Sequence, residues 1–200
     1  PAVYVGEALK GYRQWLSADS YEAKASLGGS FYSKDIADYY LTPYDLGLGP
    51  IIKFDHDFAG RSALEKMAGN QRRKKVTIVW NGEDVARVFR SLFQADDIFK
   101  YMDLPVSNYA TVPFDKVLKG GKSIGIATST GYTYNKRAMI SLGVVDIEHS
   151  KPGTEVTLVW GEEGRGSSKP TVERHAQIEI RATIAPAPFS ESARLEYRGR

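Results

Sequence analysis

The apolar residues of the second half of the chain alternate with polar ones in several short segments. Such alternation predicts β-strands, because successive side chains of a strand point to opposite faces. The pattern occurs at residues 75–80, 138–144, 156–160 and 178–184. Two further segments flank Gly120-Gly121, a pair suited to a tight hairpin turn: 116–118 and 123–127. Short antiparallel strands in this number indicate a barrel or a sandwich.

The first part of the chain has helical periodicity instead. Residues 7–16 predict an amphipathic helix whose apolar face packs on something upstream. Thr42-Pro43 indicates a short helical turn, and residues 51–54 a short strand. Residues 60–68 predict a second helix with three side chains facing inward: Ala63, Leu64 and Met67.

Near Gly69 the spacing of the apolar residues changes from helical to alternating, which predicts a domain boundary. Beyond it, Asn81 is the expected N-cap of a helix whose buried stripe is Val85, Val88, Phe89, Leu92 and Phe93. Residues 96–113 show no regular spacing of apolar residues, which predicts a long excursion, that is, an irregular connecting segment. We therefore expect one unit at 1–70 and another at 71–200, the second interrupted by a helical insertion at 82–113.

Composition narrows the class of protein. The 200 residues are 42% hydrophobic and carry a net charge of +3, with acidic and basic residues interspersed, so a soluble globular chain is expected and general binding to nucleic acid is not. The absence of cysteine excludes disulfides, thiolate metal sites and a cysteine nucleophile. No apolar stretch approaches the roughly 18 residues of a membrane helix, and no export signal opens the chain. A cytoplasmic location is the default expectation.

One basic run, Arg72-Arg73-Lys74-Lys75, interrupts this even distribution. It has the charge to hold phosphates or the glutamate tail of a folate. A solvated lead-in to the following strand is the favoured interpretation, because no aromatic stacking platform accompanies the run.

Four segments in order resemble the C-terminal half of the glycine-cleavage T-protein (aminomethyltransferase) family. They are TPYDLGLG at 42–49, KFDHDFAGRSAL at 53–64, GKSIGIATSTG at 121–131 and KPGTE at 151–155. Within the family, the chain is most similar to tetrahydrofolate-dependent O-demethylases of vanillate, syringate or 3-O-methylgallate. The narrower resemblance rests on segments 21–40 and 86–113 and on residues 160–164 followed by 168–175, because ordinary T-proteins are shorter at these three places.

The resemblance implies an α+β fold: part of a central α/β region followed by an antiparallel Greek-key β-barrel of the aminomethyltransferase type. It implies tetrahydrofolate as cofactor and an aromatic methyl ether as substrate. In the family, the anchoring carboxylate and much of the substrate pocket come from the N-terminal half, so the partner expected for this chain is that missing half. The 200 residues alone are then expected to be inactive.

Two residues match family contacts to folate. His56 occupies the basic position before the Asp57-Phe58 step, and Arg194 is the nearest match to an arginine near the C-terminus. A neutral imidazole offers one donor where arginine offers a fork, so His56 implies a weaker or differently oriented contact. The catalytic acid is not assigned: the tyrosines of 21–40 are expected to pack rather than react.

Other candidate sites have simpler explanations. Asp55-His56-Asp57 does not predict a metal site, because three consecutive residues of an extended chain cannot all face one ion. His175 with Glu173 resembles a catalytic pair, but a hydrogen-bonded structural histidine is favoured. The glycines of 161–166 fit a hairpin loop better than a phosphate cradle.

Three functions remain open at this stage. The first is the O-demethylase. The second is the same enzyme class with another donor, such as the aminomethyl carrier of glycine cleavage or a dimethylsulfonio compound. The third is a non-catalytic β-module from Arg72 onward that binds a partner, with RNA at 72–75 as one form.

Overall fold

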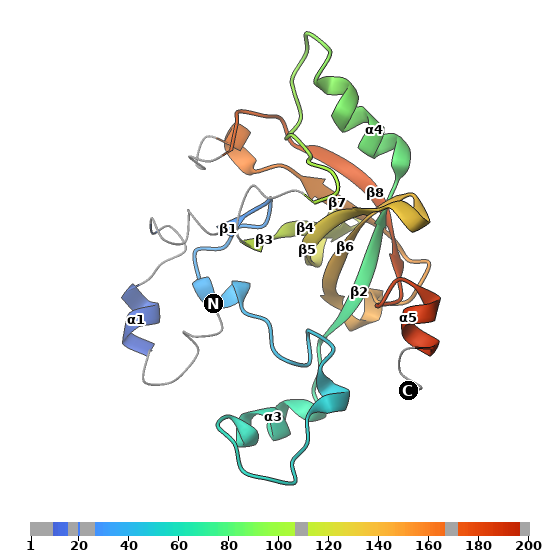
Figure 1. Ribbon diagram of the computed structural model, residues 1–200. Coiled ribbons are helices and arrows are strands. Elements are labelled where there is room, and N and C mark those ends of the chain that lie inside the picture. The colour runs from blue at the N-terminus through green and yellow to red at the C-terminus, as the bar shows by residue number, and fades with distance from the viewer. Residues whose placement is uncertain (1–9, 16–19, 21–26, 107–111, 167–171, 197–200) are drawn as a thin grey trace.

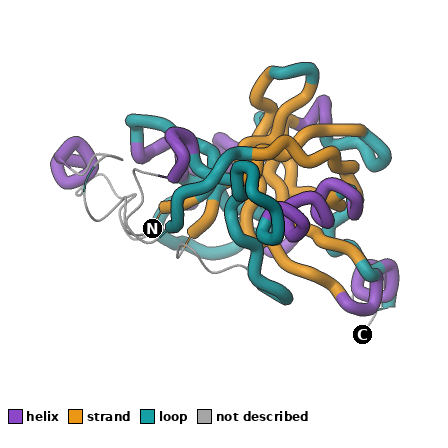
Figure 2. The backbone as a smooth tube through the Cα atoms, turned by 90° about the horizontal axis from the view of Figure 1, so that it is seen from above, coloured by secondary structure: helices purple, strands orange, loops and turns teal. Residues whose placement is uncertain are grey.

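The structure is a computed structural model that describes residues 10–15, 20, 27–106, 112–166 and 172–196 (Figure 1). Within these ranges, six antiparallel strands close a barrel in the order β2-β6-β5-β4-β7-β8. Figure 2 shows these strands gathered around a common centre. Their bounds are β2 (Arg73–Trp80), β4 (Asp115–Lys119), β5 (Lys122–Thr133), β6 (Ala138–Asp146), β7 (Glu155–Trp160) and β8 (Ile178–Ala185).

The barrel has a Greek-key connection. Strands β4, β5 and β6 are neighbours in sequence and in space, and β7 then crosses to pair with the free side of β4. Gly120 and Gly121 make the β4–β5 turn with φ of 56° and 77°, a left-handed conformation that glycine adopts at little cost. The strands predicted in the second half of the chain and the barrel are therefore confirmed, and the sandwich is not formed.

The barrel interior is apolar and closely packed. Five side chains from five different strands are fully buried: Ile78, Val117, Val145, Leu158 and Ile180. Two tryptophans meet edge to face, Trp80 and Trp160, with ring centroids 5.5 Å apart. Their indole N–H groups donate to the Ser141 hydroxyl at 3.1 Å and to the Lys100 carbonyl at 2.9 Å. The second bond ties the chain after α4 to the barrel wall.

Helix α4 (Gly82–Ser91) follows β2 and is capped as expected, because the Asn81 side chain accepts from the Asp84 amide at 3.1 Å. Val88 is fully buried, and Val85 and Phe89 pack against the barrel core. The expected buried stripe is wrong at its end: the helix stops at Ser91, so Phe93 turns outward and is 88% exposed.

The first part of the chain carries short elements. They are α1 (Lys10–Trp15), β1 (Leu27–Gly28), which pairs in parallel with β3 (Val112–Pro113), and α3 (Arg61–Ala68); α5 (Glu191–Leu195) follows the last strand. Helix α1 stands apart from the barrel in Figures 1 and 2. It confirms the helix predicted at 7–16 within its described part; residues 7–9 and 16 lie outside the described ranges, as do 21–26, 107–111 and 168–171 of the resembling segments.

Two predictions for this part are corrected. Residues 51–54 form no strand; a 3-10 turn spans Gly49–Ile51, the Ile52 amide donates back to the Gly49 carbonyl at 3.1 Å, and Ile51 is 72% exposed. Helix α3 forms where expected, but its inward residues are not buried, and Met67 is 40% exposed. Ile52, Phe54 and Leu64 are half-buried, so these segments are only partly covered within the described chain.

The fold class is therefore α+β, with helices and turns arranged around one antiparallel barrel. Among the described residues, no helix combines the length and the apolar character needed to cross a bilayer.

Candidate functional site

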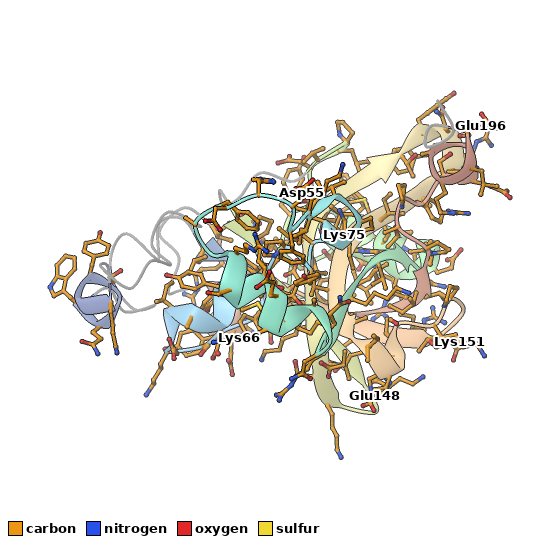
Figure 3. The ribbon with its side chains drawn as sticks, turned by 90° about the horizontal axis from the view of Figure 1, so that it is seen from below. Asp55, Lys66, Lys75, Glu148, Lys151 and Glu196 are labelled. Atoms are coloured by element: carbon orange, nitrogen blue, oxygen red, sulfur yellow. The ribbon has the colours of Figure 1, made fainter. Side chains whose placement is uncertain are left out.

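A groove of about 950 Å³ lies between the first part of the chain and the barrel. One side is the turn at 44–50 with Phe54, Ala68 and Gln71. The other side is the start of β2, Leu142 of β6, Ile147 and the loop at Ala187 and Pro188. Figure 3 looks onto this end of the molecule and labels Lys75.

Local hydrogen bonds shape the turn that forms one wall. The Thr42 hydroxyl accepts from the Asp45 amide at 3.1 Å, and the Asp45 carboxylate accepts from the Thr42 amide at 2.9 Å. This reciprocal exchange fixes the turn predicted from Thr42-Pro43. Arg73 of β2 then donates to Asp45 at 2.7 Å and to the Tyr40 carbonyl at 3.4 Å. The turn is thereby fastened to the barrel at the edge of the groove.

The groove combines apolar surface with positive charge. Four apolar lining residues are unusually exposed: Leu46 (38%), Leu48 (41%), Leu142 (38%) and Ile147 (51%). Three lining residues are basic, Arg73, Lys74 and Lys75, and none is acidic. Because Asp45 offsets the charge of Arg73, the two lysines supply the net positive charge. Such a surface suits a ligand with an apolar body and carboxylate groups.

His56 lies in the loop before α3, two residues after Phe54 of the groove lining, and is not itself part of that lining. Its side chain is 66% exposed, and its Nδ1 is 2.7 Å from an Asp55 carboxylate oxygen. Its carbonyl accepts from Arg61 at 3.1 Å, and its ring lies against Phe58 at 5.5 Å between centroids. The imidazole is therefore accessible, with one nitrogen occupied by its neighbour.

Arg194 lies on α5 and also stays outside the groove lining. It donates to the carbonyls of Pro188 and Phe189, both at 2.7 Å. Pro188 lines the groove, so Arg194 holds one of its walls from behind. The structure thus brings the two sequence-predicted residues to the surroundings of one groove and shows no contact between them.

A second group of polar side chains is buried where the first part of the chain, the excursion after α4 and the barrel meet. Glu162 is its centre: one carboxylate oxygen accepts from Lys100 Nζ at 2.8 Å and from the Gly29 amide at 2.7 Å. Lys100 Nζ also lies 4.9 Å from the Trp160 ring centroid. Both charged side chains are at most 3% exposed. The ion pair is therefore shielded from water.

His175 completes this buried cluster. Its Nε2 lies 2.9 Å from the Glu162 amide, which can only donate, so Nδ1 carries the proton and donates to the Glu173 carbonyl at 2.8 Å. The ring is then neutral, and its 3.3 Å contact with the other Glu162 oxygen is not an ion pair. The Glu173 carboxylate accepts instead from the Tyr101 amide at 2.8 Å. The structural interpretation of His175 is confirmed, and the catalytic pair is not formed.

Burial and charge in the cluster shift the pKa values of two carboxyl groups in opposite directions. Burial acts to raise the pKa of Glu162, but the Lys100 charge and the hydrogen bonds outweigh it, so the pKa lies below its ordinary value. Burial raises the pKa of Asp115 to about 7, against a weaker opposing effect of Lys100 and of the Ser30 amide, which donates to it at 3.2 Å. Asp115 therefore changes its charge near neutral pH.

The sequence did not reveal this cluster. Lys100 lies in an aperiodic segment, and Asp115 and Glu162 border strands where charged residues usually meet water. The available signal was the glycine-rich stretch after β7, because Gly161 and Gly166 leave room for the His175 ring. The cluster is closed to solvent and positions chain segments, whereas the groove is open and can take a ligand.

Known proteins resemble the chain in sequence. The syringate O-demethylase of Sphingobium sp. (strain NBRC 103272 / SYK-6) is 46% identical over 197 residues, 98% of this chain and 43% of that protein. Sesamin methylene transferase of Sinomonas sp. (strain No.22) is 36% identical over 160 residues, 75% of this chain and 33% of that protein. An aminomethyltransferase of Streptomyces coelicolor is 33% identical over 136 residues, 65% of this chain and 29% of that protein.

The chain thus spans less than half the length of these relatives. No family model matches it. The crystal structure of glycine cleavage system aminomethyltransferase T from Bartonella henselae covers 75% of the chain and 32% of its own, at 20% identity and a TM-score of 0.45. A syringate O-demethylase matches nearly the whole of this chain, and aminomethyltransferases are among its other relatives. The chain therefore belongs to the glycine-cleavage T-protein (aminomethyltransferase) family.

Proposed function

We propose that the chain is the C-terminal portion of a tetrahydrofolate-dependent O-demethylase that acts on aromatic methyl ethers of the syringate type. One observation carries the proposal: identity to the syringate O-demethylase is 46% over 98% of the chain, against 33% over 65% for an aminomethyltransferase. The rest of the polypeptide would supply the remaining walls of the site.

In the proposed reaction, the methyl–oxygen bond of the aryl ether breaks and a bond from that methyl group to a folate nitrogen forms. The folate nitrogen gives up its proton and the phenolate that leaves takes up one, so the products would be a phenol and methyltetrahydrofolate. Tetrahydrofolate supplies the nucleophilic nitrogen when bound. The basic groove fits a carboxylate-bearing cofactor of this kind, and the residues of this chain would bind and orient it rather than react. The catalytic acid is left to the remainder of the protein.

The proposal has a direct test with a chimera that joins the N-terminal region of the syringate O-demethylase relative to this chain. We expect the chimera to demethylate syringate or vanillate only when tetrahydrofolate is present, measured as phenol product and methyltetrahydrofolate by chromatography. The 200 residues alone are expected to give no turnover, because they bound the cofactor from one side only.

A panel of donors distinguishes the alternatives. Preference for an aminomethyl carrier, a methylenedioxy compound or a dimethylsulfonio compound over the aromatic methyl ethers would assign another folate-dependent transfer. The sesamin methylene transferase relative motivates the second of these donors. No product from any donor with the correctly folded chimera would end the enzymatic proposal and leave a binding β-module.

His56 and Arg194 are proposed cofactor contacts at the rim of the groove. Arg194→Gln is expected to raise the KM for tetrahydrofolate in the chimera by roughly 3–10-fold with little change in kcat, because a half-exposed charged contact contributes about 1 kcal/mol. His56→Gln should have a smaller effect, since one ring nitrogen already faces Asp55. Arg90→Gln, at an exposed position of α4, is the matched control. Equal KM values for Arg194→Gln and the control would remove Arg194 from the site.

Two further expectations belong to the proposal. The unit at 1–70 would complete the central folate-binding region of the protein, and the unit at 71–200, with its insertion at 82–113, would form the barrel domain. The reaction is placed in the cytoplasm.

A further inference from the structure

We infer that the groove between residues 44–54 and the barrel binds the p-aminobenzoyl-γ-glutamyl tail of the folate, and that Lys74 and Lys75 select cofactors with several glutamates. This inference rests on the proposed function. It adds a part of the cofactor and two specificity-determining residues that the sequence resemblance does not assign.

The lining of the groove carries a net positive charge. Its lining contains basic residues and no acidic ones, and the charge of Arg73 is already offset by Asp45 at 2.7 Å. No ion pair of Lys74 or Lys75 occurs within the described part of the chain. These two ammonium groups therefore have no carboxylate partner on the described surface, and each added γ-glutamyl unit of a folate brings one carboxylate.

Lys75 lies against the turn that forms one wall of the groove. Its side chain lies across Gly47, with its Cδ 3.5 Å from the point where a β-carbon at that position would be. Gly47 has a φ of +73°, so the turn is built around a residue without a side chain. The lysine stem is supported by the turn, which lowers the entropy lost when the ammonium group binds a carboxylate.

The groove also has an apolar part that can take an aromatic ring. Leu46, Leu48 and Ile147 are each more than a third exposed and line the same groove. Tyr44 and Phe54 add aromatic faces, and the Tyr44 hydroxyl is held by the Leu64 carbonyl at 3.1 Å. A benzoyl ring covers this kind of surface well, so the ring would lie on the apolar residues and the glutamates would continue to the lysines.

Nucleic acid fits the groove less well. Two uncompensated lysines neutralise few phosphates, and tight binding to single strands requires a longer basic path. The apolar residues of the lining would also stay in contact with water beneath a sugar–phosphate chain. An RNA ligand is therefore an outcome of the test rather than part of the proposal.

The test uses p-aminobenzoyl-monoglutamate and p-aminobenzoyl-tri-γ-glutamate, probes that lack the pterin. Calorimetric titration of the 200-residue chain should give a Kd for the triglutamate about 5-fold lower than for the monoglutamate. The Lys74→Gln/Lys75→Gln variant should lose that difference, as expected for two exposed ion pairs. Lys122→Gln/Lys136→Gln removes the same charge from exposed positions outside the groove lining and should keep the difference.

The same variants in the chimera separate this inference from the proposed function. We expect a lower KM for tetrahydrofolate triglutamate than for the monoglutamate, and loss of that preference only in the Lys74/Lys75 variant. Turnover of syringate with equal KM values for both cofactors would overturn the inference while the proposed function stands. Equal behaviour of the two double variants, or displacement of the triglutamate probe by a 20-nucleotide RNA at lower concentration, would also overturn it.

Discussion

Replacing Lys100 by methionine is expected to lower the free energy of unfolding by about 3–5 kcal/mol, as for other buried ion pairs that lose one partner. Methionine retains a similar volume beside Trp160, so the main loss is the charge that compensates Glu162. The Gly29 amide would then be the chief remaining donor to that carboxylate. Because domains of this size are stable by only about 5–15 kcal/mol, the effect should be clear in urea unfolding followed by circular dichroism.

Two further variants make this result specific to the ion pair. Lys122→Met changes an exposed lysine of β5 and is expected to stay within about 0.5 kcal/mol of the parent chain. Adding Glu162→Gln to Lys100→Met removes the uncompensated charge and should restore part of the lost stability. A loss below about 1 kcal/mol for Lys100→Met would mean that the ion pair is open to water and does not hold these segments together.

The cluster explains how an irregular excursion can keep a defined course. Residues 92–106 contain no helix or long strand, so few of their backbone groups are satisfied by regular structure. Lys100 compensates by reaching Glu162 with its side chain, and its carbonyl accepts from Trp160 at 2.9 Å. The same carboxylate binds the Gly29 amide. One buried anion therefore joins the excursion, the first part of the chain and the loop after β7.

The barrel was predictable from sequence because its strands and turns are determined by residues that are close together in the chain. Alternation of apolar and polar residues gives each strand its buried face, and Gly120-Gly121 fixes the β4–β5 turn. The same applies to α4, where the Asn81 cap lies directly before the helix. At Phe93 the pattern misleads, because apolar spacing continues past the last helical residue while the backbone does not.

The candidate site was less predictable, because it depends on contacts between distant segments. The basic run was identified, but only the structure brings Lys75 onto Gly47 and beside exposed apolar residues such as Leu142. Arg194 stays a predicted cofactor contact, and only the structure shows that it also donates to the Pro188 carbonyl of the groove wall. Asp115 had no distinguishing sequence signal, since its burial results from the packing of the first part of the chain on β4.

The Asp115→Asn variant is expected to gain stability relative to the parent chain, measured as free energy of unfolding, as the pH rises from 5 to 8. Burial raises the pKa of Asp115 to about 7 in the folded state, from 3.8 for an ordinary aspartate, so between these values the folded chain binds the proton more strongly than the unfolded one. Stability must then fall with rising pH in this window and level off above it. The loss from pH 5 to 8 is about 2–3 kcal/mol, and asparagine, which does not titrate, avoids it.

The difference between the two chains isolates this group, because Lys100, Glu162 and His175 are common to both. Unfolding free energies from urea titrations at pH 5, 6, 7 and 8 would therefore be compared as a difference at each pH. The Ser30 amide can donate to an asparagine oxygen as it does to Asp115 Oδ1, so the substitution preserves this bond. A difference that stays constant across these pH values would contradict a titrating Asp115. A difference that moves in the opposite direction would mean that the ionised carboxylate is the form that the fold stabilises, with Lys100 rather than burial as the dominant influence.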